Sequence, residues 1–321
     1  MATQPTSESF GTPHFLVRYG RNIADFFSQM AKRPLSFVSM IIVFIFIGLA
    51  FIGPSIAPYD FDEIQRGDDR RALRNGPPTT DYIMGTDSRG RDVFSRILWG
   101  ARDTIGLPAI ATGLAVLLGT LIGLVSGYYG GWIDEVLSRV MDSLLSIPAL
   151  VLALVMIATI EPLLRNSEII GFGQLVDTFG ATNISLTLVI VLLYMPIVTR
   201  VVRSSTLNVR DSGYIEAAKL RGEAPFYIMF REIFPSVLPS LVVEASLRLS
   251  YAIFLVASLG FLGLGIQPPS PEWGRMVFDA RDAIESAPWA MFYPIGAIAI
   301  LIISINLMSD GLRRVLRNEA E

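Results

Sequence analysis

The stretch LSFVSMIIVFIFIGLAFIGPSI, residues 35–56, contains no charged side chain. A helix that crosses a lipid bilayer needs about 20 consecutive, mostly apolar residues. The stretch follows a long polar segment and has no correctly placed small-residue cleavage site, which a secretory signal would require. It therefore predicts a retained membrane anchor.

Five more apolar stretches predict five further membrane helices. Hydrophobic residues make up 52% of the chain and charged residues 17%, whereas ordinary soluble domains are about 25% charged. The five stretches are residues 104–128, 141–160, 184–202, 238–265 and 289–308. We therefore predict an all-α, polytopic membrane protein with six transmembrane helices.

Glycine and proline recur inside the predicted spans. The span 104–128 is rich in glycine, which favours close approach between helices in lipid. Pro108, Pro148 and Pro196 each remove a backbone hydrogen bond from their span, so we expect kinks there. Plain packing geometry and a gating hinge are both open as the reason for these kinks.

Basic residues at the two ends of the chain predict its orientation. They are Arg18, Arg21, Lys32 and Arg33 before the first span and Arg313, Arg314 and Arg317 after the last. Because basic residues are enriched in cytoplasmic flanks, we expect both termini in the cytoplasm. The segment 58–102 is then external, and its mixture of arginines and acids predicts a small folded cap.

The expected division of the chain follows from these spans. It comprises a cytoplasmic N-terminal tail (1–34), a first transmembrane helix (35–57), the external segment (58–102), a five-helix core (103–309) and a cytoplasmic C-terminal tail (310–321). A cytoplasmic loop at 204–237 separates the fourth span from the fifth.

Residues that the chain lacks exclude several kinds of chemistry. It has no cysteine, and its single histidine, His14, lies in the polar tail, so thiolate metal sites and histidine-based sites in the spans are excluded. Neither lysine, Lys32 or Lys219, follows a glycine, so we find no phosphate-binding loop. The net charge of −3 without a basic block argues against nucleic acid as a partner. Any ATP must be bound by another chain.

The loop before the fifth span predicts a pair of short helices. Residues 213–221 form a plausible helix that ends at Gly222. Pro225, a favourable first-turn residue, begins a second helix that runs to residue 233. Small residues in the first helix let another surface come close, and apolar residues in the second offer it a face. Such a pair is typical of docking to a cytoplasmic partner.

The same loop resembles the EAA loop of ABC importer permeases. The matching residues are Glu216-Ala217-Ala218, Gly222 and Ile233-Phe234-Pro235, with Phe234 in place of the usual leucine. Other motifs are similar to the dipeptide/oligopeptide/nickel branch of that family. They are residues 84–87, 90–96, 127–134, 139–142 and 258–269, and Pro271-Glu272-Trp273-Gly274. Their order over nearly the whole chain most resembles the C-type, or second, permease.

The resemblance implies a type I ABC importer permease that does no bond chemistry itself. It implies half of a translocation channel for di- or oligopeptides, in the inner membrane of a prokaryote. The implied partners are a homologous second permease, two cytoplasmic ATPases, an extracytoplasmic solute-binding protein and membrane lipid. No cofactor is expected on this chain, because ATP and Mg²⁺ would bind to the ATPases. Related permeases carry dipeptides, longer peptides, glutathione or nickel chelates, and the motifs do not choose among these solutes.

Two positions depart from the branch pattern. Glu232 stands where histidine is common, and Val256 stands where an acidic residue is common. Both affect what can be inferred about the solute and about details of coupling, while the other motifs still carry the resemblance.

The resemblance also assigns a candidate coupling surface, since the family's loop sits in a groove of the ATPase. The residues expected there are Glu216, Ala217, Ala218, Arg221, Gly222, Pro225, Phe226 and Pro235. Polar contacts are expected from Glu216 and Arg221. Close approach is expected at Ala217, Ala218 and Gly222.

Charged residues in the spans are further candidates, because lipid disfavours charge. Glu244 and Arg248 lie four residues apart and share one helix face. They predict either a mutually neutralising pair near the cytoplasmic end or a polar lining of the solute path. Arg200 and Arg203 at the end of the fourth span are expected to be interface anchors.

Three tryptophans lie close to the ends of the predicted spans, and two other classes of membrane protein are compared with the importer. Trp132, Trp273 and Trp289 flank spans and predict an interfacial aromatic belt.

An ion-driven secondary transporter would need buried carboxylates or broken helices at mid-membrane in both halves of the chain. Only Glu244 meets that requirement here. A membrane-embedded enzyme is disfavoured, because the predicted spans contain no histidine or cysteine and carboxylate pairs occur only outside them.

Overall fold

The computed structural model describes residues 30, 32–67, 70–166 and 172–318. Residues 1–29, which include His14, Arg18 and Arg21, lie outside the described residues, as do residues 319–321 and the side chain of Arg317. Most of the predicted N-terminal tail therefore has no structural description.

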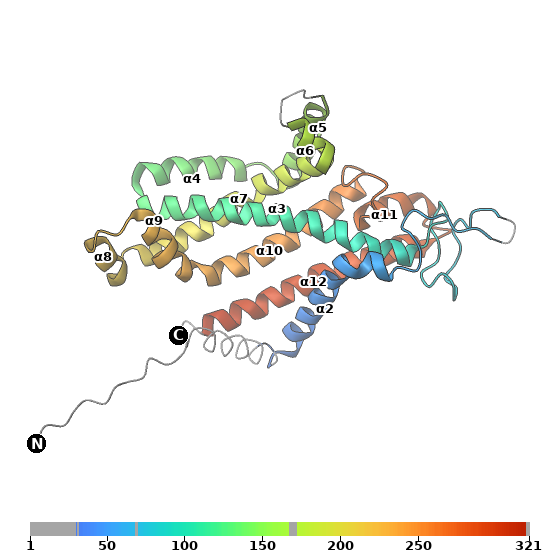
Figure 1. Ribbon diagram of the computed structural model, residues 1–321, viewed down its shortest axis with the longest axis horizontal. Helices are drawn as coiled ribbons and strands as arrows, with labels where there is room; N and C mark the ends of the chain where they lie inside the picture. The colour runs from blue at the N-terminus through green and yellow to red at the C-terminus, as the bar shows by residue number, and fades with distance from the viewer. Residues whose placement is uncertain (1–29, 31, 68–69, 167–171, 319–321) are drawn as a thin grey trace, which may run out of the picture.

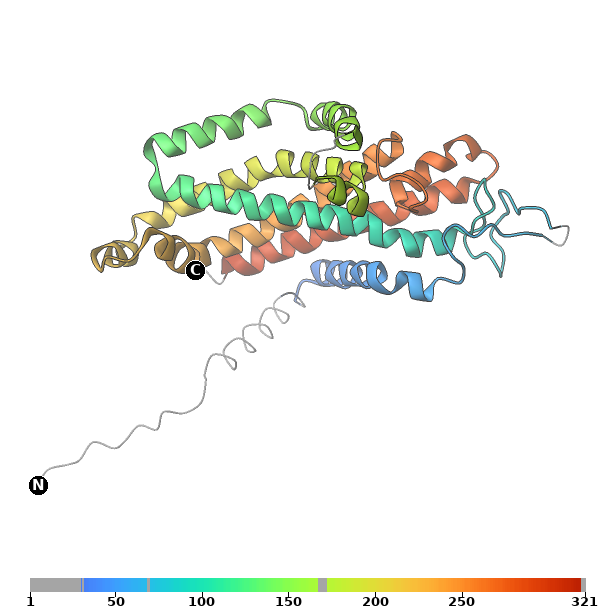
Figure 2. The same ribbon diagram turned by 45° about the horizontal axis from the view of Figure 1, so that its top comes forward.

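Long helices run side by side through the described part of the chain, and no strand is formed there (Figures 1 and 2). The larger helices are α2 (Pro34–Ile56), α3 (Val93–Tyr129), α4 (Gly131–Leu145), α5 (Ala149–Asn166), α7 (Ala181–Arg210), α10 (Phe234–Phe261) and α12 (Pro288–Asn318). The shorter ones are α6 (Phe172–Phe179), α8 (Gly213–Leu220), α9 (Pro225–Tyr227), a π-helix (Ile228–Ile233), α11 (Trp273–Ala280) and a 3₁₀ turn (Arg281–Ala283).

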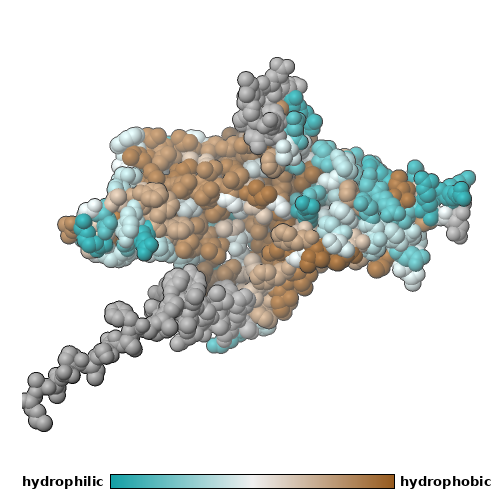
Figure 3. Space-filling view, in the orientation of Figure 1, coloured by the Kyte–Doolittle hydropathy of each residue, from teal (hydrophilic) through white to brown (hydrophobic). Residues whose placement is uncertain are grey.

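The predicted all-α membrane fold is confirmed. Five helical stretches in the described residues are long and apolar enough to cross a membrane, namely α2, α3, α7, α12 and the run Pro225–Phe261. The bent pair α4 and α5 makes a sixth if it is counted as one span. Figure 3 shows apolar residues along the length of the helices and polar residues gathered at the two ends.

The third predicted span, 141–160, is wrong as a single straight helix. The chain forms two helices there, α4 and α5, which meet at 88° across a short break. The break contains Pro148, which lacks the amide hydrogen needed to continue α4. The structure thus replaces the kink expected at Pro148 by a full break. Pro108 and Pro196 lie within continuous helices, and kinks there stay predictions.

Close packing of α3 on α7 forms the centre of the bundle. A Cβ built on Gly119 or Gly123 would lie 2.7–2.8 Å from a backbone oxygen of α7, closer than side-chain carbons approach. Gly127 is equally restricted by Thr206. The predicted role of glycine in helix approach is therefore confirmed for this face of α3. At Gly113 an added Cβ would meet nothing within 4 Å.

Several helices extend beyond the spans predicted from hydropathy. Helix α3 begins at Val93 and not near residue 104, because the Asp92 carboxylate caps it by accepting a hydrogen bond of 2.7 Å from the Ser95 amide. Helix α7 continues to Arg210, and α12 continues to Asn318. The helical bundle is therefore longer than its apolar core.

The segment between α2 and α3 folds as a compact cap at one end of the bundle, on the right in Figure 1. Its centre is Arg91, whose side chain is buried and forms ion pairs with Asp87 at 2.8 Å and Asp62 at 3.2 Å. A third carboxylate, Asp279 of α11, lies 3.8 Å away. These contacts fix the cap to α11. Its position outside the membrane stays a prediction.

The chain after α10 turns back and buries α11 against the bundle. Gly274 permits this contact, since a Cβ there would lie 2.3 Å from the backbone oxygen of Ala257. Trp273 is fully buried, and its indole Nε1 donates to the carbonyl oxygen of Ile97 at 3.0 Å. The prediction that Trp273 belongs to an interfacial belt is wrong. Trp132, by contrast, is 75% exposed.

Glu272 caps the N-terminus of α11 from a fully buried position. Its carboxylate accepts hydrogen bonds of 2.8 Å from the amides of both Gly274 and Arg275. Burial nevertheless raises the pKa of Glu272, Asp103 adds to the rise, and the two amides and Arg275 oppose it, so that the resulting pKa is about 7. Between about pH 4.5 and pH 7, the folded chain therefore holds a proton on Glu272 that the unfolded chain releases.

We expect the melting temperature of the solubilised protein to fall as the pH rises from about 4.5 to about 7. A raised pKa favours folding below the unfolded value of 4.5, and that contribution is lost as the pH passes the folded value near 7. The full loss is on the order of 3 kcal/mol. Thermal unfolding of Glu272→Gln should show a flatter pH profile. The exposed control Glu285→Gln should keep the original slope, and an identical slope in both variants would contradict the assignment.

Candidate functional site

Residues 211–235, here called the coupling hairpin, form a folded unit at the end of the bundle opposite the cap (Figure 1). The inner face of α8 is apolar, and its residues Ile215 and Ala218 are fully buried. They belong to one core cluster with Ile228 and Ile233 from the second leg and Val202 from α7. The hairpin is thus a rigid extension of the bundle and not a free loop.

Gly222 makes the turn between the two legs. Its φ of 77° lies in the left-handed region, which residues with a Cβ avoid. The amide of Gly222 donates to the carbonyl of Lys219 at 3.0 Å, and that of Glu223 donates to the carbonyl of Ala218 at 3.2 Å. The expected helix end at Gly222 is therefore confirmed. An added Cβ would meet nothing within 4 Å, so the turn faces open space.

The outer surface of the hairpin carries the residues that could contact another protein. Leu220 is 89% exposed and Phe226 is 68% exposed, although both are apolar. Arg221 and Glu223 form an exposed ion pair of 3.6 Å between them. The exposed charges are well hydrated without a partner. A partner that covers the exposed apolar side chains would remove them from water, and this burial stabilises the complex.

The structure places seven of the eight predicted coupling residues on this outer surface. They are Glu216, Ala217, Arg221, Gly222, Pro225, Phe226 and Pro235, all exposed. The eighth, Ala218, is fully buried against the bundle. Its predicted contact with another protein is therefore corrected. The small side chain of Ala218 allows α8 to pack closely against α7 and the second leg of the hairpin.

Three exposed residues on the hairpin were missed by the sequence interpretation. Leu220, Tyr214 and Tyr227 are all apolar or aromatic and 39–89% exposed. The helical period offers a signal for Leu220, which lies five residues after Ile215 and two after Ala218 and so points away from the buried face of α8.

The second leg of the hairpin continues directly into a membrane span. Helix α9, the π-helix Ile228–Ile233 and α10 form one unbroken helical run, whereas the sequence predicted a separate short helix. A π-helix is a less favourable backbone arrangement and often occurs at functional positions. Phe226 and α10 therefore belong to one continuous helical run.

Glu244 and Arg248 form an ion pair near the middle of α10, with 2.8 Å between Arg248 Nε and Glu244 Oε1. The predicted pair is thus confirmed, and its place relative to the cytoplasmic side of the membrane stays a prediction. The two atoms lack the alignment of a hydrogen bond. The guanidinium also lies over the rings of Tyr194 and Tyr251, at 5.7 and 4.9 Å from their centres.

Arg200 and Arg203 connect α7 to α4. Arg203 donates to Asp134 Oδ2 at 2.6 Å, and Arg200 donates to Asp142 at 2.7 Å. These contacts hold α4 beside α7. The expected role of the two arginines as interface anchors stays a prediction. Within the described ranges, no cluster of three histidine or acidic side chains is arranged to hold a metal ion.

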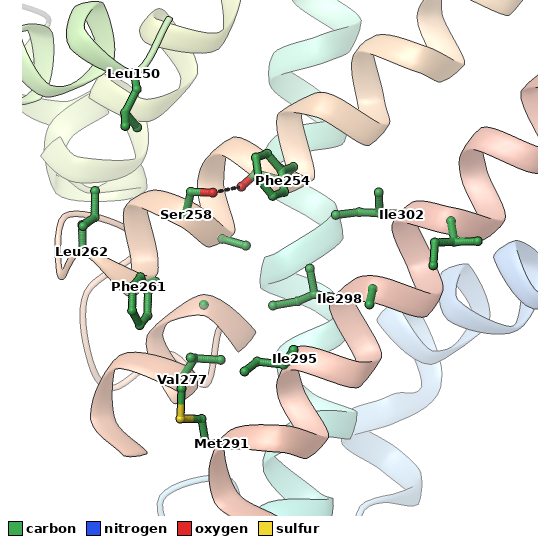
Figure 4. A pocket seen from close by; sticks show the side chains of 14 residues that line it. Leu150, Phe254, Ser258, Phe261, Leu262, Val277, Met291, Ile295, Ile298 and Ile302 are labelled. Carbon is green, nitrogen blue, oxygen red and sulfur yellow. Dashed lines mark hydrogen bonds between the residues drawn. The ribbon is translucent and has the colours of Figure 1, made fainter. Parts of the chain in front are cut away.

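A large apolar cavity of about 630 Å³ lies among α10, α11 and α12, with Leu150 of α5 at its edge (Figure 4). Phe254 and Phe261 of α10 face Ile295 and Ile302 of α12 across it. The hydroxyl of Ser258 is already bonded to the Phe254 carbonyl at 2.7 Å. The cavity therefore offers no charged group to a polar solute.

Comparison with known families gives two matches. The model described as binding-protein-dependent transport system inner membrane component matches residues 119–319. The model described as the N-terminal TM domain of oligopeptide transport permease C matches residues 22–78. Together they cover most of the chain.

Curated relatives and a solved structure agree with these matches. A dipeptide transport system permease protein DppC of Alkalihalophilus pseudofirmus is 36% identical over 90% of this chain and 88% of its own. A glutathione transport system permease protein GsiD of Pectobacterium atrosepticum is 33% identical over 91% and 89%. An inward-facing MetNI methionine ABC transporter chain is similar in fold, with a TM-score of 0.52 and 21% identity over 70% of this chain and 95% of that one.

Proposed function

This chain belongs to the binding-protein-dependent transport system inner membrane components, and we propose that it is the C-type permease of an ATP-driven peptide importer. It forms half of a translocation channel and performs no bond chemistry. Relatives named for dipeptide and glutathione transport support peptides as the solute class.

The observation that carries this proposal is the coupling hairpin. Its inner face is fixed to the bundle, and its outer face leaves Leu220 and Phe226 uncovered by the chain. Because the hairpin lies at a polar end, lipid does not cover these side chains (Figure 3). A groove on a cytoplasmic ATPase supplies the missing cover. One leg continues into α10, so closure of an ATPase pair moves a channel helix.

The complete importer contains further subunits. A homologous permease provides the other half of the channel, and two ATPases bind ATP and Mg²⁺. A solute-binding protein docks on the cap side, where residues 58–92 and α11 lie. Both termini and the hairpin then lie in the cytoplasm. The apolar cavity among α10, α11 and α12 suits contact with the partner permease or lipid, and Glu244 with Arg248 lines the solute path.

Co-purification and transport together test the proposal. The chain would be expressed with its neighbouring importer subunits, purified in detergent and reconstituted in vesicles. An ATPase should purify with the chain, and labelled Ala-Ala should enter only with ATP and the binding protein. Uptake driven by an ion gradient without ATP would instead favour a secondary transporter and refute the proposal.

The exposed apolar residues of the hairpin give a direct prediction. Leu220→Ser with Phe226→Ser should lose most of the co-purifying ATPase, because burial of a large apolar side chain contributes about 1.5–3 kcal/mol each. Membrane insertion should be unchanged. The matched control is Ile83→Ser, an exposed apolar position in the cap that is 59% exposed. It should retain the ATPase, and equal retention by the hairpin variant would contradict this role.

A further inference from the structure

A second large cavity, of about 520 Å³, lies between α7, α10 and α12. Its lining residues are Val201, Ser236, Pro239, Ser240, Val243, Glu244, Arg313 and Leu316. Ser236 and Pro239 directly follow the coupling hairpin, so the cavity lies in the half of the bundle that carries it. The hydroxyls of Ser236 and Tyr214 of α8 are 3.4 Å apart, which places the cavity wall beside the hairpin. Its volume is within the range of about 300–1,000 Å³ typical of small-molecule sites.

Glu244 is the acidic group of this cavity and is 9% exposed. Its ion pair with Arg248 offsets the cost of burying a carboxylate in a span. The carboxylate still lacks a well-aligned hydrogen-bond donor among the described residues. Buried carboxylates normally accept several hydrogen bonds, so Glu244 can take a further donor without losing Arg248.

Arg313 is the basic group of the same cavity, and it lies on α12 in an exposed position. It forms no ion pair with any residue that the structure describes. Ser236 and Ser240 line the same cavity, and their hydroxyls can donate or accept hydrogen bonds. The lining thus presents a buried anion, an accessible cation and neutral hydrogen-bonding groups, and the rest of it is apolar.

We propose that this cavity is a binding site for a small zwitterion, with the ammonium group at Glu244 and the carboxylate at Arg313. The proposal rests on the proposed function, because a short peptide carries both charges on a backbone that the serine hydroxyls can bind. The site is the last solute-binding position on the translocation path, beside the coupling hairpin. The headgroup of an ammonium-bearing phospholipid shares this chemistry and is separated from a peptide by the experiment.

The test uses the absence of cysteine from the chain. Ser240→Cys places a single reactive thiol in the cavity wall, and Ser204→Cys places one on an exposed position of α7 that does not line it. Each complex is reconstituted in phosphatidylglycerol nanodiscs, whose lipid has no ammonium group. The rate of thiol modification by a maleimide is then measured with and without Ala-Ala.

We expect Ala-Ala to slow modification of Ser240→Cys and to leave Ser204→Cys unchanged. At ten times its Kd, a bound ligand leaves about one site in eleven free, so the rate should fall about tenfold. N-acetyl-Ala-Ala, which has no ammonium group, should not protect. In the Ser240→Cys background, Arg313→Gln should abolish the protection. The double variant Glu244→Gln with Arg248→Gln should also abolish the protection. Both charges are removed together so that neither is left buried without its partner.

Three results would overturn the inference: no protection by Ala-Ala, equal protection by the N-acetyl peptide, or protection retained in both charge variants. Slow modification that appears without peptide in phosphatidylethanolamine nanodiscs, and that Ala-Ala does not change, would assign the site to lipid and would also overturn it. Transport by the parent complex is measured separately. If ATP-driven uptake of Ala-Ala is present while protection is absent, the site is wrong and the importer function stands. Absence of ATP-driven Ala-Ala uptake would refute dipeptides as the solute of this importer, and with them the peptide site proposed here.

Discussion

Replacing Gly222 by valine is expected to abolish solute-stimulated ATP hydrolysis in the assembled importer while the chain still inserts in the membrane. The φ of 77° at this position is unfavourable for residues with a Cβ by about 1–2 kcal/mol, and more for a β-branched side chain. Valine would therefore displace the turn that sets the two legs of the hairpin. ATPase activity with and without the loaded binding protein measures the effect.

Two matched variants separate backbone strain from contact with a partner. Asparagine tolerates the left-handed region, so Gly222→Asn keeps the turn but adds a side chain that meets no atom of this chain within 4 Å. Gly213→Ala changes another hairpin glycine that lacks a positive φ and also faces open space. If Gly222→Asn is also uncoupled, the added side chain collides with the ATPase. If it is active, strain explains the valine variant. Normal coupling in Gly222→Val would refute the role of the turn.

Replacing Trp273 by alanine is expected to destabilise the protein by about 3–5 kcal/mol, the usual effect of removing a large buried aromatic side chain. The ring is fully buried and lies 5.6 Å from that of Phe46 in α2, centre to centre. Its loss also leaves the Ile97 carbonyl without the indole donor. Because α11 holds Asp279 beside Arg91, the cap should loosen as well.

Thermal unfolding of the purified protein and limited proteolysis of the cap measure this effect. Trp273→Phe keeps most of the ring but loses the 3.0 Å hydrogen bond, so it should be intermediate. Trp132→Ala removes the same side chain from a site that is 75% exposed and should change the melting temperature little. Equal melting temperatures for the two alanine variants would show that Trp273 does not anchor α11.

The coupling hairpin shows which structural features local sequence can predict and which it cannot. Its helix end at Gly222 and its second start at Pro225 follow from backbone preferences of single residues, and the structure has both. Which faces point outward was predicted only in part. Ala218 and Ala217 are chemically identical neighbours, yet one is buried and the other exposed, because only packing against α7 and the second leg distinguishes them.

The charged residues of the spans show the same limit. A spacing of four residues is enough to place Glu244 and Arg248 on one helix face, and they do pair. Tyr194 of α7 lies beside Arg248, and Arg313 of α12 lines one cavity with Glu244, so both arrangements depend on how three helices pack. No local pattern in α10 contains that information.

The sequence by itself determined that the chain is helical, that its helices lie in lipid and where its coupling hairpin lies, because hydropathy, proline and glycine act over a few residues. The tertiary structure alone decided that the third span breaks by 88°, that Trp273 is buried, and that Glu244 and Arg313 share one cavity. These features arise from contacts between residues far apart in the chain. Their free energy depends on the packing of whole helices, which a local window of sequence does not record.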